Sequence, residues 1–432
     1  MDRMEISRDR YLEALKLRIN NGAIKVITGI RRAGKSYLLF NLFYKHLLET
    51  GVSEDRIIRI ALDDDQNKEL RDSNTLSTYI RALANDKSKD YFLLLDEIQL
   101  AITQEELRNE GQYIGVFSVL NGLLRLGNVD IYVTGSNSRF LSSDILTEFR
   151  GRGDEIHVQP LSFKEFMQVY DGDIYHGWTE YSTYGGLPFL LSMKTDPQKS
   201  KYLQNLFKET YMKDILEHNH IGKTQELDAL IDILASSIGS LTNPKKIANT
   251  FKSAMGSTIS ENTIVKYISI LQDAFLISEA TRYDIKGRKY IGSIRKYYFE
   301  DIGLRNARLN FRQVEENHIM ENAIYNELKD RGYNVDVGIV ETRERNGQIS
   351  KRSSYEVDFV VNNGSRRYYI QSAFSLETEQ KEQQECKSLN SINDNFGKII
   401  VVKDIIKPHM DEKGILRVGL FDFLLDERIL SF

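Results

Sequence analysis

The sequence of 432 residues predicts an α/β fold in which helices cover both faces of a parallel sheet. Short, continuous apolar runs recur through the first third of the chain, and such runs are typical of parallel strands buried on both faces. A Gly-rich turn and a helical segment follow the first run directly, which is the order of a strand–turn–helix unit. The runs that we expect to form strands are Ile24–Thr28, Ile57–Leu62, Tyr91–Leu95 and Val129–Thr134.

The turn after the first predicted strand reads Gly-Ile-Arg-Arg-Ala-Gly-Lys-Ser and matches the pattern G-x-x-x-x-G-K-[ST] at every position. In this motif the free N–H groups at a helix N-terminus point at an anion, and the helix dipole favours negative charge there. We therefore predict that the turn holds the phosphates of ATP. The residues expected to bind the nucleotide are Gly29, Arg31, Arg32, Ala33, Gly34, Lys35, Ser36 and Tyr37.

Four side chains are predicted to carry the chemistry at this turn. Lys35 is expected to reach the β- and γ-phosphates as a catalytic group, and the Ser36 hydroxyl to bind Mg²⁺. Asp96 and Glu97 follow the third apolar run, and open α/β sheets bind ligands at the carboxyl ends of their strands. We expect Asp96 to hold Mg²⁺ directly or through water, and Glu97 to polarise the attacking water as a general base.

Two further pairs of residues are catalytic candidates. Ser136 and Asn137 follow the fourth predicted strand and can contact the γ-phosphate or the attacking water; the alternative is a turn selected for its backbone. Arg150 and Arg152 lie in a glycine-rich segment, where one of them can serve as an arginine finger, in cis or from another subunit. Arg152 is the favoured candidate. The alternative is an arginine that pairs with the acidic residues just after it.

Bulk composition limits the partners and the compartment. The net charge is −4, so no global field draws the whole molecule to nucleic acid, and any such site must be a local patch. Cys386 is the single cysteine, which rules out an internal disulfide framework and fits a reducing cytosol. No apolar run approaches the ~20 residues of a membrane span, and Met1–Glu5 lacks the apolar core of a signal peptide. We therefore expect a cytoplasmic protein with no membrane partner.

Six segments follow one another along the chain: Gly29–Ser36, Leu93–Gln99, Val133–Ser138, Phe149–Gly153, Pro160–Phe166 and Tyr184–Pro188. Taken in this order, they resemble a family of archaeal and bacterial AAA-type ATPases in which the ATPase core is joined to a C-terminal domain of unknown function. The resemblance implies an AAA-type P-loop NTPase core of the additional-strand catalytic-glutamate class, consistent with Glu97 as the base. We assign residues 1–165 to this core and 166–225 to a helical lid or linker.

Residues 226–298 are predicted to form a winged helix-turn-helix, because three helical segments precede a hairpin, and the family resemblance agrees. The third helix carries one basic residue, Lys266, whereas the wing from Arg282 to Lys296 carries six basic residues and one acid. This basic wing is a candidate to bind the phosphates of DNA without reading its sequence. The alternative is a module that packs between domains and presents a solvated basic turn.

Residues 299–432 are predicted to form an α/β domain that resembles the core of restriction-endonuclease-like nucleases, with Glu321 in a helix and Asp358 on one of two paired strands. Those enzymes hold Mg²⁺ between an Asp and a Glu-x-Lys carboxylate, and the Lys assists the attacking water. Here Gln371 and Ala373 stand in place of the Glu and the Lys. We therefore expect the fold without nuclease activity, and a structural role or a protein partner for Glu321 and Asp358.

These predictions combine into one leading function. ATP and Mg²⁺ bind at the P-loop, and hydrolysis drives rearrangement of the winged-helix and nuclease-like regions, with DNA as a candidate partner. The alternative is a slow-turnover, nucleotide-dependent switch or scaffold that binds a protein partner without nucleic acid. An arginine acting in trans requires an oligomer, whereas an arginine acting in cis does not, and the sequence leaves both arrangements open.

Overall fold

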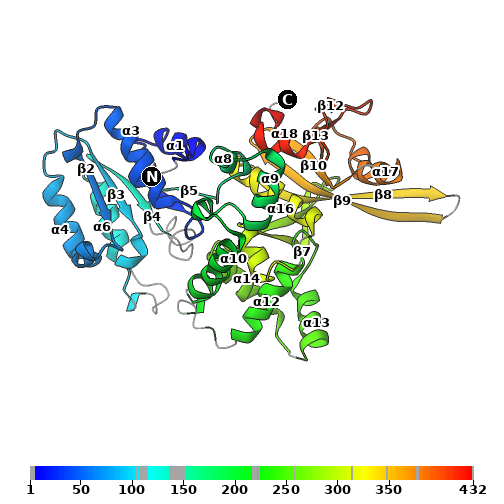
Figure 1. Cartoon of the computed structure of the whole chain (residues 1–432), viewed down its shortest axis with the longest axis horizontal. Coiled ribbons are helices and arrows are strands. Elements are labelled where there is room, and N and C mark those ends of the chain that lie inside the picture. The colour runs from blue at the N-terminus through cyan, green and yellow to red at the C-terminus, as the bar shows by residue number, and fades with distance from the viewer. Residues whose placement is uncertain are drawn as a thin grey trace. The chain divides into compact units, whose positions relative to one another are not determined.

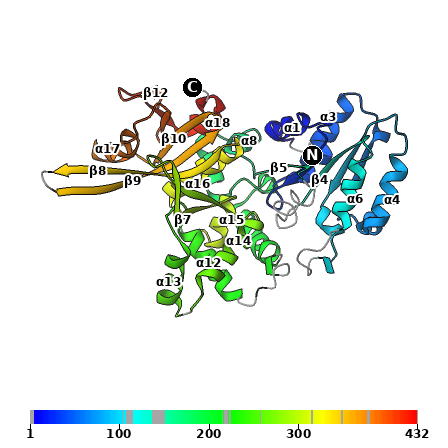
Figure 2. The same ribbon diagram turned by 180° about the vertical axis from the view of Figure 1, so that it is seen from behind.

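The chain divides into two compact units. The first comprises residues 1–160 and 273–275, and the second comprises residues 161–272 and 276–432. In Figure 1 the first unit runs from blue to cyan and the second from green to red, and Figure 2 shows the same ribbon from behind. The computed structural model describes residues 5–103, 105–106, 115–135, 151–213, 215–216, 221, 224–256, 258–312, 315–346, 349–375 and 379–430.

A five-stranded parallel sheet forms the centre of the first unit, with the strand order β2-β3-β4-β1-β5 (Figure 1). Every residue of β1, β3 and β4 is buried, as expected for parallel strands covered on both faces. The predicted α/β fold is therefore confirmed for this unit. The strands are β1 (Ile24–Thr28), β2 (Ile57–Ala61), β3 (Tyr91–Asp96), β4 (Val129–Thr134) and β5 (Gly153–His157).

Strand β5 was not predicted from the sequence. Its five residues, Gly-Asp-Glu-Ile-His, contain a single apolar side chain, so they show no apolar run. The strand lies at the edge of the sheet and pairs along the whole of β1, from Ile24–Gly153 to Thr28–His157. An edge strand is covered less than a central strand, and Ile156 is the one buried residue of β5, so polar side chains are tolerated there.

Helices cover both faces of this sheet. On one face α4 and α6 contribute Leu76, Ile80 and Phe117 to the apolar core, together with inward residues of the strands. On the other face the Phe43 ring packs 4.6 Å from the ring of Tyr132 on β4. The helical elements of the unit are α1 (Asp9–Lys16), α2 (Lys35–Tyr37), η1 (Leu38–Phe43), α3 (Tyr44–Glu49), η2 (Glu54–Arg56), η3 (Asp65–Arg71), α4 (Ser73–Leu83), η4 (Ile98–Ala101) and α6 (Gly115–Leu124).

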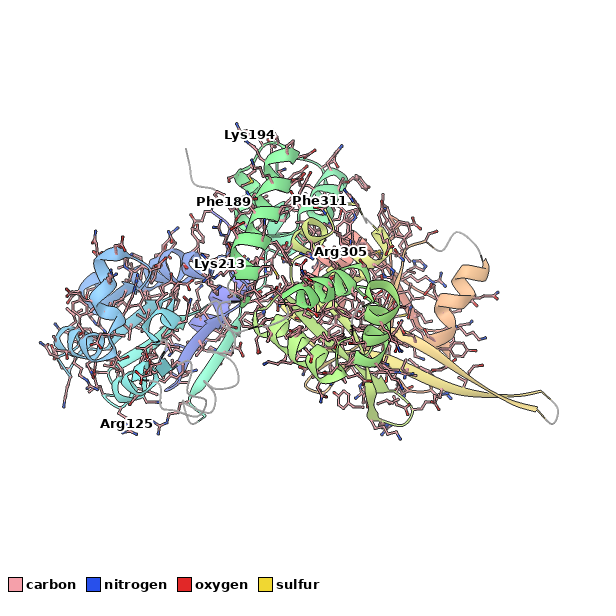
Figure 3. All side chains as sticks on the ribbon, turned by 90° about the horizontal axis from the view of Figure 1, so that it is seen from below. Arg125, Phe189, Lys194, Lys213, Arg305 and Phe311 are labelled. Carbon is pink, nitrogen blue, oxygen red and sulfur yellow. The ribbon has the colours of Figure 1, made fainter. Side chains whose placement is uncertain are left out.

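The second unit begins with a group of helices. Figure 3 shows Arg305 inside this unit, whereas Lys194 and Phe189 project from its surface. The Arg305 side chain is fully buried, and its Nε donates to the Ala235 carbonyl at 2.8 Å. The helices up to the sheet are α8 (Phe163–Met167), α9 (Ile174–Tyr184), η6 (Pro188–Ser192), α10 (Asp196–Leu206), η7 (Phe207–Met212), α12 (Thr224–Ser236), α13 (Pro244–Met255) and α14 (Glu261–Asp273).

A mixed eight-stranded sheet follows, with the order β12-β13-β11-β10-β9-β8-β6-β7. Helix α17 packs on it, and Cys386 and Leu389 join the apolar core beneath. The strands are β6 (Ile277–Asp284), β7 (Lys289–Phe299), β8 (Asn334–Asn346), β9 (Ile349–Asn363), β10 (Arg366–Ala373), β11 (Gly397–Val402), β12 (His409–Met410) and β13 (Ile415–Gly419). The remaining helices are α15 (Ile302–Arg308), α16 (Glu316–Asp330), α17 (Glu379–Asn390), α18 (Leu420–Leu425) and η8 (Glu427–Leu430).

Several predicted elements of this unit are confirmed. Asn243 caps α13 with Pro244 in the first turn, and the Ser260 hydroxyl accepts from the Thr263 N–H at 3.1 Å at the start of α14. Strands β6 and β7 form the expected antiparallel hairpin, and β9 pairs with β10 as expected.

One arrangement was not foreseen. Strand β6 of the hairpin also pairs in parallel with β8, so the predicted wing and the predicted nuclease-like domain share one continuous sheet. The domain boundary predicted between residues 298 and 299 therefore falls within the last residues of β7, a strand of this sheet. In the described part of the chain, no helix combines the length and apolar composition needed to cross a lipid bilayer.

Candidate functional site

The turn after β1 has the backbone of a phosphate-binding loop. Gly29, Arg32 and Gly34 take positive φ values of 130°, 65° and 97°, and such alternation turns successive N–H groups toward one point. Gly29 is required for a second reason, since a Cβ at this position would lie 2.2 Å from the Val158 carbonyl oxygen. Helix α2 begins directly after the loop, so its free N–H groups also face the position of an anion.

Lys35 stands in the first turn of that helix. Its side chain is buried, and its ammonium donates to the carbonyl oxygens of Gly29 at 2.8 Å and Ile30 at 3.0 Å. These bonds hold the positive charge over the loop. Lys35 therefore lies against the loop, and its contact with the β- and γ-phosphates stays a prediction.

Asp96 lies at the carboxyl end of β3 and accepts hydrogen bonds from the hydroxyls of Thr134 and Ser36. Burial raises the pKa of Asp96 above its ordinary range, and these two hydroxyl bonds oppose that shift. A hydroxyl and a carboxylate that already touch form the oxygen pair that a Mg²⁺ ion needs at a P-loop. The residues present therefore fit the ion that we predicted, and Ser36 and Asp96 would hold it.

Glu97 follows Asp96 with a left-handed backbone, φ 54°. Its N–H donates to the Thr134 hydroxyl at 3.1 Å, and its carboxylate accepts from the Gln99 side-chain amide. A positive φ at a glutamate is uncommon and turns the side chain away from the line of the strand. Because β4 lies between β1 and β3 in the sheet, Glu97 is one strand removed from the P-loop strand.

Thr134 was missed in the sequence. It ends β4, is fully buried, and bonds to both Asp96 and the backbone of Glu97. Its position at the carboxyl end of the strand beside the P-loop was visible in the sequence, but a threonine closing an apolar run reads as an ordinary strand residue.

A second missed group lies on β5 at the same edge of the sheet. The Thr28 hydroxyl donates to the Glu155 carboxylate at 2.6 Å and lies 3.1 Å from Nδ1 of His157. This group could not be placed from the sequence because β5 itself was not predicted. Thr28 directly precedes the P-loop, so the contacts with Glu155 and His157 hold the residue from which the loop starts.

Arg152, the favoured arginine, lies at the amino ends of the strands and not at the carboxyl ends, where its own chain would bind the nucleotide. Arg152 immediately precedes β5, and its carbonyl accepts from the N–H of Ile24, the first residue of β1. The P-loop follows the last residue of β1, so a five-residue strand of about 16 Å separates the two levels. The cis role of Arg152 is therefore wrong, whereas the trans role remains a prediction. Ser136, Asn137 and Arg150 lie outside the described residues.

Comparison with known proteins places this chain in a family. An uncharacterized protein of Haemophilus influenzae (strain Rd) is 32% identical over 430 residues, which cover 98% of this chain and 100% of the relative. The chain belongs to that protein's family. An uncharacterized protein of Methanocaldococcus jannaschii is 27% identical over 402 residues, covering 89% of this chain and 82% of the relative.

Two family models match within the chain. Residues 21–167 match an AAA domain, and residues 175–315 match a domain of unknown function, DUF8612. The first unit of this family member therefore carries an AAA domain, and the P-loop, Asp96 and Glu97 all lie inside it.

Solved structures show only distant likeness. A Walker-type ATPase of Pyrococcus abyssi has 16% identity and a TM-score of 0.48, over 71% of this chain and 96% of that chain. The ORC1 protein of Aeropyrum pernix, solved in complex with DNA, has 13% identity and a TM-score of 0.33, over 71% of this chain and 92% of that chain. At these values neither likeness carries an argument about activity or partners.

The basic wing of this family member is smaller than the sequence indicated. Lys296 is 2% exposed and contacts three carboxylates, and the Arg295 guanidinium pairs with Glu279. Lys296 is therefore not placed to bind a phosphate from solution, which removes it from the expected patch of six. The charge of Arg295, whose side chain is 38% exposed, is compensated by Glu279. Lys286, Arg288 and Lys289 are exposed at the turn of the hairpin, and Arg282 is half-buried.

The residues of the predicted nuclease-like site do come together. The Lys296 ammonium lies 2.8 Å from Glu321 Oε1 on α16 and 3.4 Å from Asp358 Oδ1 on β9. Gln371 accepts weakly from the Asp358 N–H at 3.4 Å, while its amide nitrogen donates to Glu385 at 3.1 Å. Ala373 is buried in the apolar core below. The lysine at this site was missed because it comes from the wing hairpin, more than sixty positions before Asp358.

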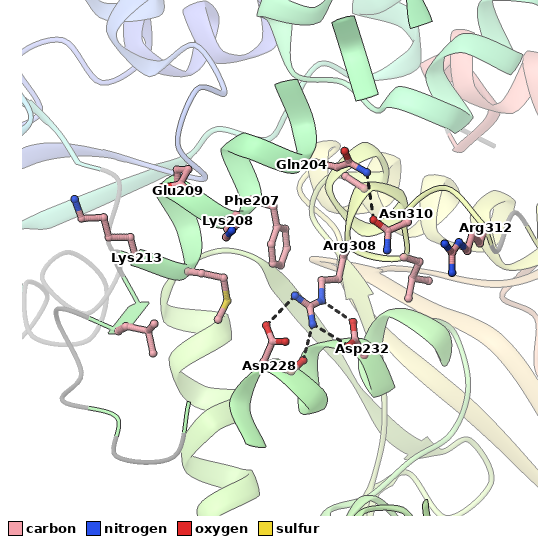
Figure 4. Close-up of a pocket in the computed structure, with 14 residues that line it drawn as sticks. Gln204, Phe207, Lys208, Glu209, Lys213, Asp228, Asp232, Arg308, Asn310 and Arg312 are labelled. Atoms are coloured by element: carbon pink, nitrogen blue, oxygen red, sulfur yellow. Dashed lines mark hydrogen bonds and ion pairs between the residues drawn. The ribbon is translucent and has the colours of Figure 1, made fainter. Parts of the chain in front are cut away.

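A separate cavity of about 1040 Å³ lies among the helices of the second unit (Figure 4). Arg308 on its wall donates to the carboxylates of Asp228 at 2.8 Å and Asp232 at 2.5 Å and 2.8 Å. These bonds satisfy the guanidinium, so it is not available as an anion receptor. None of the site residues predicted from the sequence lines this cavity.

Proposed function

We propose that this chain is a Mg²⁺-dependent ATPase whose catalytic centre is the carboxyl edge of β1, β3 and β4. The observation that carries the proposal is the convergence of three groups there. The P-loop supplies Lys35 and the N–H groups that bind an anion. Ser36 and Asp96 supply the oxygen ligands of a magnesium ion. Glu97 supplies a carboxylate in reach of the same edge.

Each group then has one task. Lys35 and the loop N–H groups neutralise the phosphate oxygens, on which charge spreads during phosphoryl transfer. Ser36 and Asp96 would hold the magnesium ion, which would supply positive charge to the phosphates. Glu97 accepts a proton from the attacking water, and the Gln99 amide and the Thr134 hydroxyl fix its position.

Steady-state phosphate release from the purified chain tests this proposal. Glu97→Gln should lower the turnover number by about 10²–10⁴-fold while leaving nucleotide affinity within a few fold, because a general base contributes that much and does not hold ground-state phosphates. Lys35→Ala should abolish nucleotide binding. Glu49→Gln, at an exposed position of α3, is the matched control and should behave as wild type. Unchanged turnover in Glu97→Gln would refute the assignment of the base.

A second candidate function is a nucleotide-dependent switch with slow turnover in the isolated chain. The position of Arg152 favours it, since this arginine cannot complete its own site and would need a second copy of the chain. Mixing Lys35→Ala chains with Arg152→Ala chains separates the cases. Recovery of ATP turnover in the mixture supports an arginine supplied in trans, and no recovery, with wild-type turnover in Arg152→Ala alone, removes Arg152 from the mechanism.

We further propose that nucleotide state alters the second unit and that the hairpin turn contacts the phosphates of DNA. What supports the contact is the exposed cluster Lys286, Arg288 and Lys289 beside a single acid, Asp284. Asp284 is engaged in the turn itself, since its Oδ1 accepts from the Gly287 N–H at 2.9 Å. Hydrogen exchange of residues 277–299 with ATP and with ADP tests the coupling; identical protection in both states would argue against it.

A further inference from the structure

Three carboxylates converge on one ammonium in the second unit. Lys296 Nζ lies 2.8 Å from Glu321 Oε1, 2.7 Å from Glu356 Oε1 and 3.4 Å from Asp358 Oδ1. The side chains come from α16, β9 and β7, and Lys296 is 2% exposed. A buried ammonium is stable only when carboxylates or other acceptors surround it, so the cluster is a built cation site and not a chance surface contact.

The carboxylates are held in place by other bonds as well. Asp358 Oδ2 accepts from the Ser372 N–H at 2.8 Å, and Glu321 Oε1 also accepts from the Tyr298 hydroxyl at 2.7 Å. Gly239 packs against Glu321 so closely that a Cβ there would lie 3.0 Å from both of its carboxylate oxygens. The oxygens therefore point at one position, and that position is taken by Lys296 Nζ.

A nuclease of the type this domain resembles would hold Mg²⁺ between such carboxylates, so the residues must be tested against that ion. They do not fit it. Gln371 supplies an amide where a second carboxylate is needed and turns its nitrogen to Glu385, and Ala373 supplies no amine. With Lys296 in place, the described residues include no set of three Asp, Glu, His or Cys side chains arranged to hold a metal ion, and this includes Glu321, Glu356 and Asp358.

We propose that Lys296 is the resident cation of this site, occupying the position of a metal ion and joining the β6–β7 hairpin to α16 and β9. The single positive charge of the ammonium compensates the three carboxylates only in part, because burial still raises the pKa of Glu321 above its ordinary range. The lysine excludes a second cation by charge and by volume. The site is thus a metal-independent junction between the basic hairpin and the nuclease-like fold, and this holds whether or not the first unit hydrolyses ATP.

The direct test removes the lysine and asks whether a metal ion takes its place. Lys296→Met keeps the length of the side chain and removes the charge, which leaves three converging carboxylates without a cation. The nucleotide-free full chain should lose thermal stability and regain several degrees of its melting temperature in millimolar Mn²⁺. Electron paramagnetic resonance of Mn²⁺ should show one tight site more than in wild type. The double variant Lys296→Met/Asp358→Asn should lose both effects.

Binding of Mn²⁺ at the P-loop is common to all variants and cancels in these differences. A folded Lys296→Met chain that gains no Mn²⁺ site would overturn the proposal. If this variant does not fold with or without metal, wild type against Asp358→Asn still decides. Identical Mn²⁺ binding in those two chains supports the resident lysine, and a wild-type Mn²⁺ site that Asp358→Asn removes refutes it.

Discussion

The hydroxyl of Thr134 donates a hydrogen bond to the carboxylate of Asp96. The same hydroxyl accepts from the N–H of Glu97 at 3.1 Å, so one side chain at the end of β4 orients both acidic residues at the end of β3. The bond to Asp96 also opposes the upward pKa shift that burial imposes on this carboxyl. Thr134 is therefore a positioning residue for the predicted magnesium ligand and for the predicted base.

Thr134→Val should lower ATP turnover by about tenfold, because it keeps the shape of the side chain and removes a hydrogen bond of the kind worth about 1.5–3 kcal/mol to a charged group. The Mg²⁺ concentration for half-maximal turnover should rise as well, since the pKa of Asp96 moves further up. Thr134→Ser retains the hydroxyl and should preserve both quantities. Wild-type turnover in Thr134→Val would show that Asp96 and Glu97 are held by other bonds.

Gly29→Ala should destabilise the first unit and abolish nucleotide binding. The new Cβ would lie 2.2 Å from the Val158 carbonyl oxygen, at a φ of 130° that L-residues rarely adopt. Gly51→Ala is the matched control, because Gly51 also has a positive φ, of 90°, but nothing lies within 4 Å of its Cβ position. In urea unfolding we expect Gly29→Ala to cost about 1–3 kcal/mol more than Gly51→Ala. Equal losses would mean that the collision is relieved by a loop shift.

Asp301 should make the second unit more stable as the pH falls from about 7 to about 4. Burial raises the pKa of Asp301 to about 6, although the N–H groups of Gly186 and Leu304, each at 2.8 Å, oppose the shift. Between its unfolded value of about 3.9 and this folded value, the native state binds a proton that the unfolded state has released. Stability from this group is thus full below the unfolded pKa and is lost as the pH rises through 6.

Asp301→Asn checks that dependence. The asparagine cannot ionise, so the difference in free energy of unfolding between wild type and variant should grow toward low pH by on the order of 2–3 kcal/mol. Urea transitions of the full chain at half-unit intervals from pH 4 to pH 8 would measure it. A difference that is constant across this range would mean that the Asp301 carboxyl keeps its ordinary pKa in the folded chain.

Removal of two hairpin charges should weaken DNA binding in a salt-dependent manner. Arg288→Ala/Lys289→Ala should reduce the slope of log affinity against log salt by about 2, because each phosphate contact contributes about 0.9. Lys194→Ala/Lys201→Ala removes the same charge from exposed positions near α10 and should leave the slope unchanged. If both double variants lower the slope equally, the effect is one of net charge and the hairpin turn is not the contact.

Local patterns were enough to predict much of this molecule. The P-loop, the positions of Asp96 and Glu97, strands β1–β4 and the capped helices α13 and α14 all follow from short stretches of sequence. They could be predicted because a buried parallel strand, a Gly-rich turn and a helix cap each have a composition that is visible within a few residues.

The partners of those stretches could not be predicted in the same way. Arg152 lies in the glycine-rich segment that favours an arginine finger, yet the register of β5 against β1 puts it at the amino ends of the strands, away from the P-loop. Likewise, Lys296 reads as one more basic residue of a solvated wing, yet it is buried among Glu321, Glu356 and Asp358. In both cases the charge was visible, but its surroundings come from strands distant in sequence.

The sequence by itself determined a Gly-rich P-loop and two acidic residues at the end of a later strand of the same sheet, and that Gln371 and Ala373 stand where the predicted nuclease resemblance expects a Glu and a Lys. Only the tertiary structure decided that Thr134 joins the acids, that Arg152 cannot serve its own site, and that a lysine from the hairpin fills the carboxylate cluster. The physical reason is that backbone conformation is set by neighbours along the chain, whereas burial and charge compensation are set by neighbours in space.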